Sequence, residues 1–355
     1  MTRTQESLGK IEAVRKKLAE LDVKGVAINH QNNFSWITSG GRGFIGIASE
    51  GACGTVVITQ DKAYLFTNNI EGPRLMDEEI PEGVLEPVIV PWQQAHTIGD
   101  KIVEVVGGPV ATDAELNDFF VLERSVFNEN EIQRFKVLGE KVTSLFEGIC
   151  LSLERGMTEF DVAAQIAKSH WENGIEPVNH LIACDSRSYK YRHFVPTMGK
   201  IDKGVIVSMC ARAQGLVVSI TRNVDFDGGA FSVNYEKLVK VEADTINAIA
   251  QDVTMQELYD ITTAAYTRHG LDGEFNKHHQ GGPIGYAPRE SLIKPGNPLK
   301  VRTNSAYAFN PSAISAKCED SVLWDGEKLI HLTYPGENWP KIEVGGIIRP
   351  GVLYR

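Results

Sequence analysis

A pattern that occurs twice in the second half of the chain constrains the fold most. Residues 158–161 read Thr-Glu-Phe-Asp and begin an expected helix that ends at Gly174. Residues 254–257 read Thr-Met-Gln-Glu and begin another helix that ends at Gly270. In each case the glycine lies sixteen positions after the threonine. A threonine followed three residues later by a glutamate is typical of a helix N-terminus, and the first copy has aspartate in place of glutamate. A glycine is typical of a helix C-terminus.

Each of these helices follows a longer helical stretch and precedes a segment with histidine and then strands. Helix, capped helix and strands, repeated once, predict two similar halves packed around a pseudo-two-fold axis. Coincidence is the alternative, because threonine caps and glycine stops are common.

Length and composition indicate an acidic folded chain of two domains. At about 150 residues per domain, 355 residues give roughly two domains. Hydrophobic residues make up 42% and charged residues 23%, which is ordinary for a globular protein. Because the net charge is −10, the chain lacks the positive charge that attracts nucleic acid, so we expect no nucleic-acid partner.

Several absences indicate a cytoplasmic protein. The sequence has no run of 18 apolar residues, so we expect no membrane partner, and residues 1–18 have no apolar core typical of a signal peptide. Five scattered cysteines without a CxxC motif indicate reduced thiols rather than disulfides or a zinc site.

We place a domain boundary near residue 125, between a small α/β domain (1–125) and a larger domain (126–355). A charged helix carries Ile11, Val14, Leu18 and Leu21 at helical spacing. Short strands follow, with an aromatic and glycine-rich loop at 33–43; the expected strands are 26–28, 56–59 and 63–67 (a hairpin), 88–90 and 110–112. Asn128 then caps a long helix with an apolar stripe from Ile132 to Ile149.

Four segments resemble motifs of the pita-bread family of creatinase, prolidase, aminopeptidase P and methionine aminopeptidase. Residues 215–222 (GLVVSITR) resemble a "GYxxDxTR" strand, and residues 318–323 (CEDSVL) resemble an "xEDTVL" strand. Residues 193–197 (HFVPT) resemble an "HxxPT" loop, and residues 33–40 resemble an "NxxYLTG" loop. The resemblance covers nearly the whole chain. It implies an α/β (α+β) fold, with a creatinase-type N-terminal domain and a pseudo-two-fold pita-bread C-terminal domain.

The resemblance also implies where metal ligands would lie, and most are missing. The metallopeptidase members hold two metal ions with two Asp, one His and two Glu. Carried over, the first Asp falls within 208–210, where no residue is acidic, and the second falls on Ser219. The first Glu falls on Asn310, the His on His279 and the second Glu on Glu319.

Three of the five ligands are therefore lost, all of them anionic, and hard divalent cations need anionic oxygens. We predict no dinuclear metal site and no cofactor, with a single weakly held ion at His279 and Glu319 as the alternative.

Loss of metal does not exclude catalysis, because creatinase shares this fold without the metal ligands. Its catalytic histidine falls on His193, and histidine near neutral pKa is the natural general acid or base. Its two glutamates fall on Thr221 and Asn310, so we do not expect this chain to be creatinase itself. An ordinary exposed loop histidine is the alternative.

Three more residues are catalytic candidates. If His278 and His279 lie on a strand, they face opposite sides, and family spacing selects His279. Tyr286 occupies the position of the family's second site histidine and could donate a hydrogen bond to a developing oxyanion; a core tyrosine is the alternative.

Glu319 and Asp320 are likewise expected on opposite faces of a strand that ends in a turn at 325–326. Imidazolium neighbours would keep Glu319 charged, so that it could orient water or a histidine. A carboxylate kept only for stability is the alternative.

Further residues are candidates for substrate binding. Arg42, between two glycines, is expected to reach a substrate anion in the partner subunit of a homodimer, as arginines of the creatinase N-terminal domain do; a solvated loop arginine is the alternative. Arg289 could clamp a carboxylate or pair at the surface. Arg222 is a further candidate, with a structural role as the alternative. Ser219 and Asn310 retain hydrogen-bonding capacity without charge. Cys210 could be a nucleophile, but its apolar strand favours a buried thiol.

These observations favour a metal-independent, creatinase-like hydrolase or lyase acting on a C–N bond of a small amino-acid-like substrate, with His193 transferring the proton. A proline-specific metallopeptidase is one alternative. A non-catalytic binding protein of the same fold is another.

Overall fold

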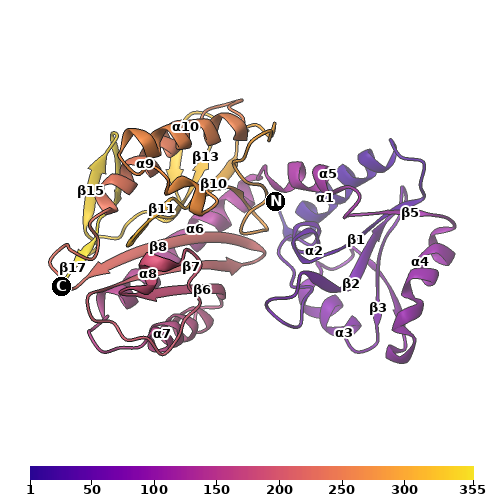
Figure 1. Cartoon of the computed structure of the whole chain (residues 1–355). Helices are drawn as coiled ribbons and strands as arrows, with labels where there is room; N and C mark the ends of the chain where they lie inside the picture. The colour runs from indigo at the N-terminus through magenta and orange to yellow at the C-terminus, as the bar shows by residue number, and fades with distance from the viewer. The chain divides into compact units, whose positions relative to one another are not determined.

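The computed structural model describes residues 1–355, and they form two compact units. The first comprises Met1–Arg124 with residues 214–216, and the second comprises residues 125–213 and 217–355. Strands and helices are mixed in both units, as expected for the predicted fold class (Figure 1). No helix is both long and apolar enough to cross a membrane.

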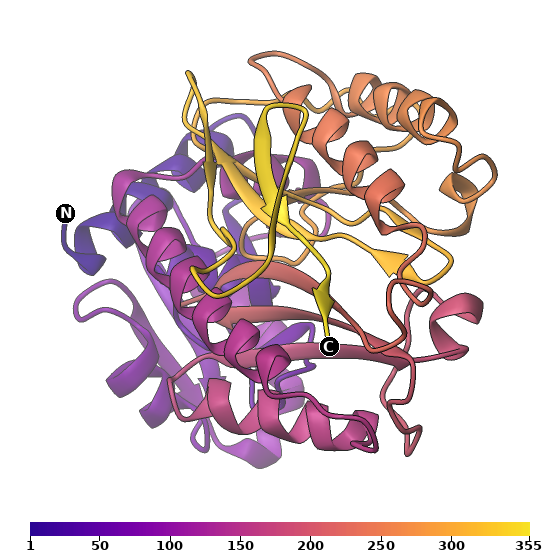
Figure 2. The same cartoon turned by 90° about the vertical axis from the view of Figure 1, so that its left-hand side faces the viewer.

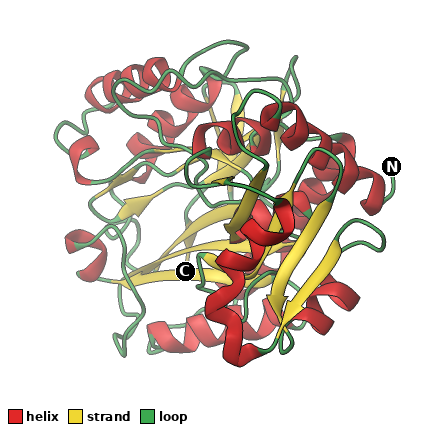
Figure 3. Ribbon diagram, turned by 90° about the vertical axis from the view of Figure 1, so that its right-hand side faces the viewer, coloured by secondary structure: helices red, strands yellow, loops and turns green.

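The first unit is built on a mixed five-stranded sheet in the order β4-β3-β2-β1-β5. Its strands are β1 (Gly25–His30), β2 (Gly51–Ile58), β3 (Ala63–Asn68), β4 (Glu86–Val90) and β5 (Val110–Thr112). Its helices are α1 (Arg3–Leu18), α2 (Gln31–Ile37), α3 (Gly72–Arg74), η1 (Leu75–Glu79), η2 (Trp92–Thr97), α4 (Ile98–Val106) and α5 (Asn117–Arg124). Helices pack alongside the strands of this unit (Figure 3). All five predicted strands are present, and the hairpin is confirmed as antiparallel pairing of β2 with β3.

The segment expected to be a loop at 33–43 begins with a helix, α2, so that prediction is wrong for its first half. Phe34, Trp36 and Ile37 are buried, and the hydroxyl of Thr38 donates to the carbonyl oxygen of Phe34 at 2.7 Å. A helix of two turns is too short to show the 3.6-residue periodicity, and tertiary burial stabilises it.

The second unit contains two four-stranded sheets, in the orders β17-β8-β7-β6 and β14-β13-β10-β9. The strands of the first sheet are β6 (Glu176–Cys184), β7 (Gly204–Ala213), β8 (Leu216–Asp225) and β17 (Leu353–Tyr354). Those of the second are β9 (Gly281–Ile284), β10 (Ser305–Phe309), β13 (Asp320–Trp324) and β14 (Leu329–His331). Two-stranded pairs join β11 (Ser312–Ala313) to β12 (Ala316–Lys317) and β15 (Lys341–Val344) to β16 (Ile347–Pro350).

Helices border these strands within the second unit. They are α6 (Glu129–Leu151), α7 (Glu159–Trp171), α8 (Arg187–Lys190), α9 (Tyr235–Asn247), α10 (Met255–Arg268) and η3 (Phe275–Lys277). In Figure 2 this unit faces the viewer, with α6 and α7 in magenta toward the bottom left and α9 and α10 in orange toward the top right. The long helix predicted from Asn128 is confirmed, with Asn128 as its N-cap.

The two repeated helices are confirmed as equivalent elements. Thr158 caps α7 and Thr254 caps α10, each with φ −83° and ψ 159°, and both form complete capping boxes. Each threonine also forms an isolated antiparallel bridge, Thr158 with Lys200 and Thr254 with Lys300. The repeat in the sequence therefore corresponds to two halves built alike, which is the predicted pita-bread arrangement.

Buried ion pairs tie these two halves together. Asp320 at the start of β13 accepts hydrogen bonds from Arg222 on β8 at 3.1 Å and from Arg349 on β16 at 3.0 Å. Arg222 also donates to Glu147 on α6 at 2.7 Å, and Arg349 pairs with Glu242 on α9 at 2.7 Å. All five side chains are buried, so each charge depends on its partners for compensation.

Candidate functional site

A cavity of about 110 Å³ lies within the second unit and collects several of the predicted site residues. Its walls come from β6, β7 and the segments that precede or follow β9, β10 and β13. The lining residues are Asn179, Leu181, His193, Ser208, Cys210, His279, Pro288, Arg289, Asn310, Lys317 and Glu319. Segments far apart in the sequence therefore meet in one small pocket.

Glu319 is the anion of this pocket and is almost fully buried. Its Oε1 accepts a hydrogen bond from Nη2 of Arg289 at 2.5 Å. Its Oε2 lies 3.2 Å from the hydroxyls of both Ser208 and Thr221 and 3.9 Å from Nζ of Lys317. The two hydroxyls are 2.7 Å apart and hydrogen-bonded to each other, so one of them donates to Oε2. The carboxylate is thus held by one guanidinium, one hydroxyl and a nearby ammonium.

The electrostatics of Glu319 differ from the prediction in one respect. Burial alone would raise its pKa, but Lys317 and Arg289 outweigh burial and hold the pKa below its usual value. The predicted charged form therefore follows from an ammonium and a guanidinium rather than from imidazolium neighbours. Asp320 faces away into the buried ion pairs described above, so the predicted alternation of these two residues is confirmed.

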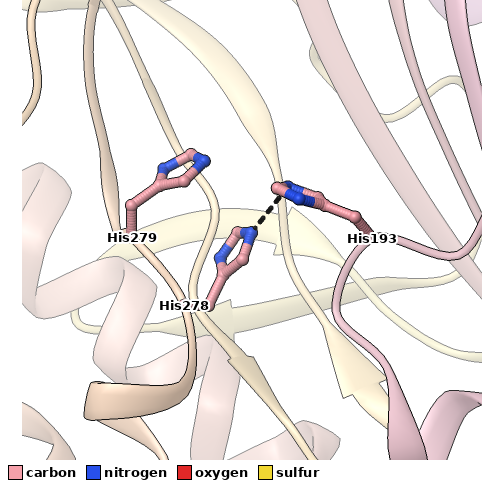
Figure 4. Close-up of side chains that lie close together, drawn as sticks. All are labelled: His193, His278 and His279. Carbon is pink, nitrogen blue, oxygen red and sulfur yellow. Dashed lines mark hydrogen bonds between the residues drawn. The ribbon is translucent and has the colours of Figure 1, made fainter.

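Three histidine rings meet beside the pocket (Figure 4). Nε2 of His278 lies 3.0 Å from Nε2 of His193, and the rings of His278 and His279 stack with centroids 4.4 Å apart. His193 and His279 line the cavity, and His193 belongs to the loop before β7.

The prediction that His278 and His279 point to opposite sides is wrong. Alternation requires a strand, and β9 begins only at Gly281. Both rings instead lie on the side of His193, and the amide nitrogen of Gly281 donates to Nδ1 of His279 at 3.3 Å.

All three imidazoles are neutral at pH 7. Burial, reinforced by nearby cations, lowers the pKa of His278 to about 2 and that of His279 to about 4. His193 is the most exposed of the three, but its partial burial lowers its pKa, with Lys317 and Arg289 acting in the same direction and Glu319 opposing them. A neutral His193 at the pocket can accept a proton, as a general base must.

Lys317 is a pocket residue that the sequence analysis missed. Its side chain is 2% exposed, and its ammonium lies beside the cavity and over the ring of Phe194. Burial lowers the pKa of Lys317, while Glu319 opposes that shift. One signal could have found it: Lys317 lies two residues before Glu319, and residues two apart in an extended segment share a face.

Two of the predicted polar residues lie at the pocket. Asn310 lines it and is buried, and its Oδ1 has no hydrogen-bond partner in the protein. Ser219 is fully buried next to the pocket, and its hydroxyl oxygen accepts a hydrogen bond from Nη1 of Arg289 at 3.3 Å. Arg289 is therefore a pocket residue bound to Glu319, and the alternative of a surface pair is wrong.

Cys210 on β7 also lines the pocket, and burial raises the pKa of its thiol. A buried thiol with a raised pKa is a poor nucleophile, in agreement with the preferred interpretation. All five cysteines are free, as expected.

Two other predicted residues are not brought to the pocket. The hydroxyl of Tyr286 donates to Glu131 on α6 at 2.6 Å, and the ring is buried, so the catalytic assignment is corrected to the core alternative. Arg222 is fully buried between Glu147 and Asp320, so its assignment to substrate binding is likewise corrected.

Arg42 lies in the first unit, where its backbone amide and its guanidinium both donate to Glu79, at 2.8 and 2.9 Å. About half of its side chain is exposed. Its expected role toward a partner subunit stays a prediction.

A protein-family model described as metallopeptidase family M24 matches residues 133–332, which is more than half of the chain. The chain belongs to metallopeptidase family M24. No curated protein matches it.

Solved structures agree on the fold. An Xaa-Pro dipeptidase from Bacillus anthracis superposes with a TM-score of 0.76 at 18% identity, over 95% of this chain and 99% of that one. A prolidase from Pyrococcus horikoshii OT3 gives 0.74 at 19% identity, over 93% and 99%. The N-terminal domain of the FACT complex subunit SPT16 from chickpea gives 0.71 at 13% identity, over 94% and 97%. At these identities the likeness establishes the fold, and the peptidase names belong to the neighbours.

The M24 family is named for metallopeptidases, but this pocket lacks the ligands that a metal pair needs. At the five positions carried over by resemblance, the segment 208–210, Ser219 and Asn310 supply no anionic oxygen. Glu319 is already bonded to Arg289, with Lys317 alongside. Two divalent cations would have to displace the guanidinium of Arg289 from Glu319, and they would still lie close to the positive charges of Arg289 and Lys317. These residues therefore do not fit a metal pair.

The three histidines are close enough to hold one ion, because their ligand atoms all lie within 4.8 Å of one another. Neutral imidazoles are suitable ligands. Burial is the largest cause of the lowered pKa values of His278 and His279, and the positive charges of Arg289 and Lys317 add to it. Those two positive charges also disfavour a metal cation beside the rings.

Proposed function

We propose that this chain is a metal-independent hydrolase, or lyase, of the creatinase type that acts on a C–N bond of a small amino-acid-like substrate, with His193 as the proton-transfer group. One observation supports it above the others: Arg289 and Lys317 flank Glu319 in the pocket where resemblance places the metal ligands. A pocket with two cations and one anion suits an organic ligand with negative charge better than a pair of metal ions.

The hydrolytic step would use the residues in distinct roles. Neutral His193 takes a proton from water as the water oxygen bonds to the substrate carbon. The C–N bond then breaks, and the same proton passes from His193 to the leaving nitrogen. His279 lies beside His193 and positions the water or substrate, and Asn310 supplies a hydrogen bond. Arg289, fixed by Glu319, stabilises negative charge that develops on the substrate.

We also propose a cytoplasmic homodimer in which Arg42 of one subunit completes the pocket of its partner. Arg42→Ala and His193→Gln variants should each be inactive alone. Mixing them should restore activity, because one pocket of each mixed dimer then contains neither substitution. A mixture no more active than its components would contradict this arrangement.

The test of the proposed function is turnover by metal-free protein. Protein treated with a chelator is assayed on guanidino, ureido and cyclic amino-acid compounds, together with the His193→Gln variant. We expect full activity without metal and a loss of about 10²–10⁴-fold in His193→Gln. The exposed His96 lies in the first unit, so His96→Gln is the matched control and should retain activity.

Each alternative predicts a different result. Peptide cleavage that requires added metal would support the proline-specific metallopeptidase and overturn the proposal. Binding without turnover of any compound, unaffected by His193→Gln, would support a non-catalytic binding protein and would equally overturn it.

A further inference from the structure

We propose that Lys317 is the anion-binding group of the pocket, and that it holds the carboxylate of a substrate whose N–H group donates to Asn310. The inference builds on the proposed function for the reaction, and it adds the chemical class of the ligand. Four observations support it: the hydrogen bonding of Lys317, the charge of the pocket, the unpaired oxygen of Asn310 and the size of the cavity.

The ammonium of Lys317 has N–H donors that no protein group uses. Glu319 is its nearest carboxylate, at 3.9 Å, which is beyond hydrogen-bond distance. Nζ donates no hydrogen bond to a protein group although the side chain is only 2% exposed, and Lys317 borders the cavity. A buried ammonium without hydrogen-bonded acceptors is costly, so an acceptor that enters the cavity is stabilised there.

The charges around the cavity leave a surplus of one positive charge. With Lys317 protonated beside Glu319, the pocket has two cations and one anion, and the lowered pKa values of His193 and His279 favour their neutral forms. The nearby Arg192 is paired with Glu274 at 2.5 Å, and the half-exposed Lys277 shares that carboxylate, so this group adds no negative charge to the pocket. Glu319 already accepts hydrogen bonds from Arg289 and from a hydroxyl, so an added monoanion would be directed to Lys317.

Asn310 defines the second feature of the ligand. Its Oδ1 is buried at the pocket and has no donor from the protein. A buried carbonyl oxygen left unsatisfied costs about 1–3 kcal/mol, and an N–H group of the ligand would remove that cost. Together, Lys317 and Asn310 select a molecule with both a carboxylate and an N–H donor, such as a ureido or guanidino acid.

The size of the cavity limits the ligand. A cavity of about 10–15 Å³ holds one water molecule, so the 110 Å³ of this cavity holds a carboxylate and several more atoms. A short amino-acid derivative fits this space, and a long peptide does not.

Binding of a matched pair of probes tests the inference without requiring turnover. N-carbamoylglycine carries the carboxylate, and N-carbamoylglycinamide replaces it with an uncharged amide. Equilibrium binding to the full chain should favour the acid by about tenfold or more. Lys317→Met should weaken binding of the acid about tenfold to a hundredfold and leave binding of the amide unchanged. Lys237→Met, the same substitution at an exposed position on α9, should bind both probes as the wild type does.

Equal binding of acid and amide by the wild type, or unchanged acid binding by Lys317→Met, would overturn the inference. A second measurement does not depend on the fold of the variant. Wild-type crystals soaked in bromide should show an anomalous peak beside Lys317, and a pocket without one overturns the assignment. Loss of turnover with acid binding intact, as expected for His193→Gln, would bear on the proposed function alone.

Discussion

Removing the charge of Glu319 tests the electrostatic account of the pocket most sharply. Glu319→Gln leaves Arg289 and Lys317 in the interior without an anion. Breaking a buried ion pair from one side costs about 3–5 kcal/mol in protein stability. In a unit of this size, we expect the melting temperature to fall on the order of 10 °C.

A second substitution separates charge from packing. The group formed by Glu319, Arg289 and Lys317 carries a net charge of +1, which rises to +2 in Glu319→Gln. Adding Arg289→Met returns it to +1, so the double variant should be more stable than the sum of the single effects by about 0.5–3 kcal/mol. Calorimetry on the full chain measures each melting temperature. Glu86→Gln, at an exposed pair with Lys62, is the control and should change little.

The pH dependence provides a further check on Glu319. Its pKa is lowered in the folded protein, so its stabilising effect is present above the unfolded value of about 4.3 and is lost as the pH falls through the folded value. The stability difference between wild type and Glu319→Gln should therefore shrink below about pH 4. A Glu319→Gln variant as stable as wild type at pH 7, or a difference that grows in acid, would refute the reasoning.

The remaining predictions concern the histidines, α6 and the buried ion pairs. In an NMR titration, the imidazole of His279 should remain neutral at pH 5.5, because its pKa is lowered to about 4; a midpoint near 6.5 would contradict the burial described. Gly139→Ala should destabilise the protein in denaturant unfolding, because a Cβ at that position would overlap the backbone oxygen of Leu332. Gly148→Ala on the same helix meets no other atom and should stabilise the protein by about 0.5–1 kcal/mol. Equal effects of the two substitutions would contradict this packing. Asp320→Asn leaves two buried arginines without their shared carboxylate and should cost about 3–5 kcal/mol by the same assay, and a neutral result would show that these pairs are dispensable.

Much of the fold could be predicted because its signals are local. The capping residues Thr158, Thr254 and Asn128 determine where three helices begin, and a threonine or asparagine side chain satisfies backbone N–H groups regardless of distant contacts. The helix α2 escaped prediction because its stability comes from burial of residues such as Phe34 against other elements.

The site was less predictable, because pocket membership depends on which side chains converge from distant segments. His193, His279, Asn310, Arg289 and Glu319 were identified by resemblance or by residue type, and all line the cavity. Motif positions alone could not reveal how each side chain is engaged.

The wrong assignments of Tyr286 and Arg222 have the same physical origin. Tyr286 and Arg222 occupy positions close to the motifs, but the carboxylates of Glu131, Glu147 and Asp320 engage them in the core. Lys317 was missed because lysine is almost never fully buried, and only the completed fold shows that this one is.

The metal content of the purified protein tests the central claim most directly. After equilibration with excess Mn²⁺, Co²⁺ or Zn²⁺ and removal of free ions, elemental analysis gives the number of ions bound per chain. A pocket that holds Arg289 and Lys317 against Glu319 predicts far fewer than one tightly bound ion per chain. Two tightly bound ions per chain, located at Glu319 by anomalous scattering, would contradict the account.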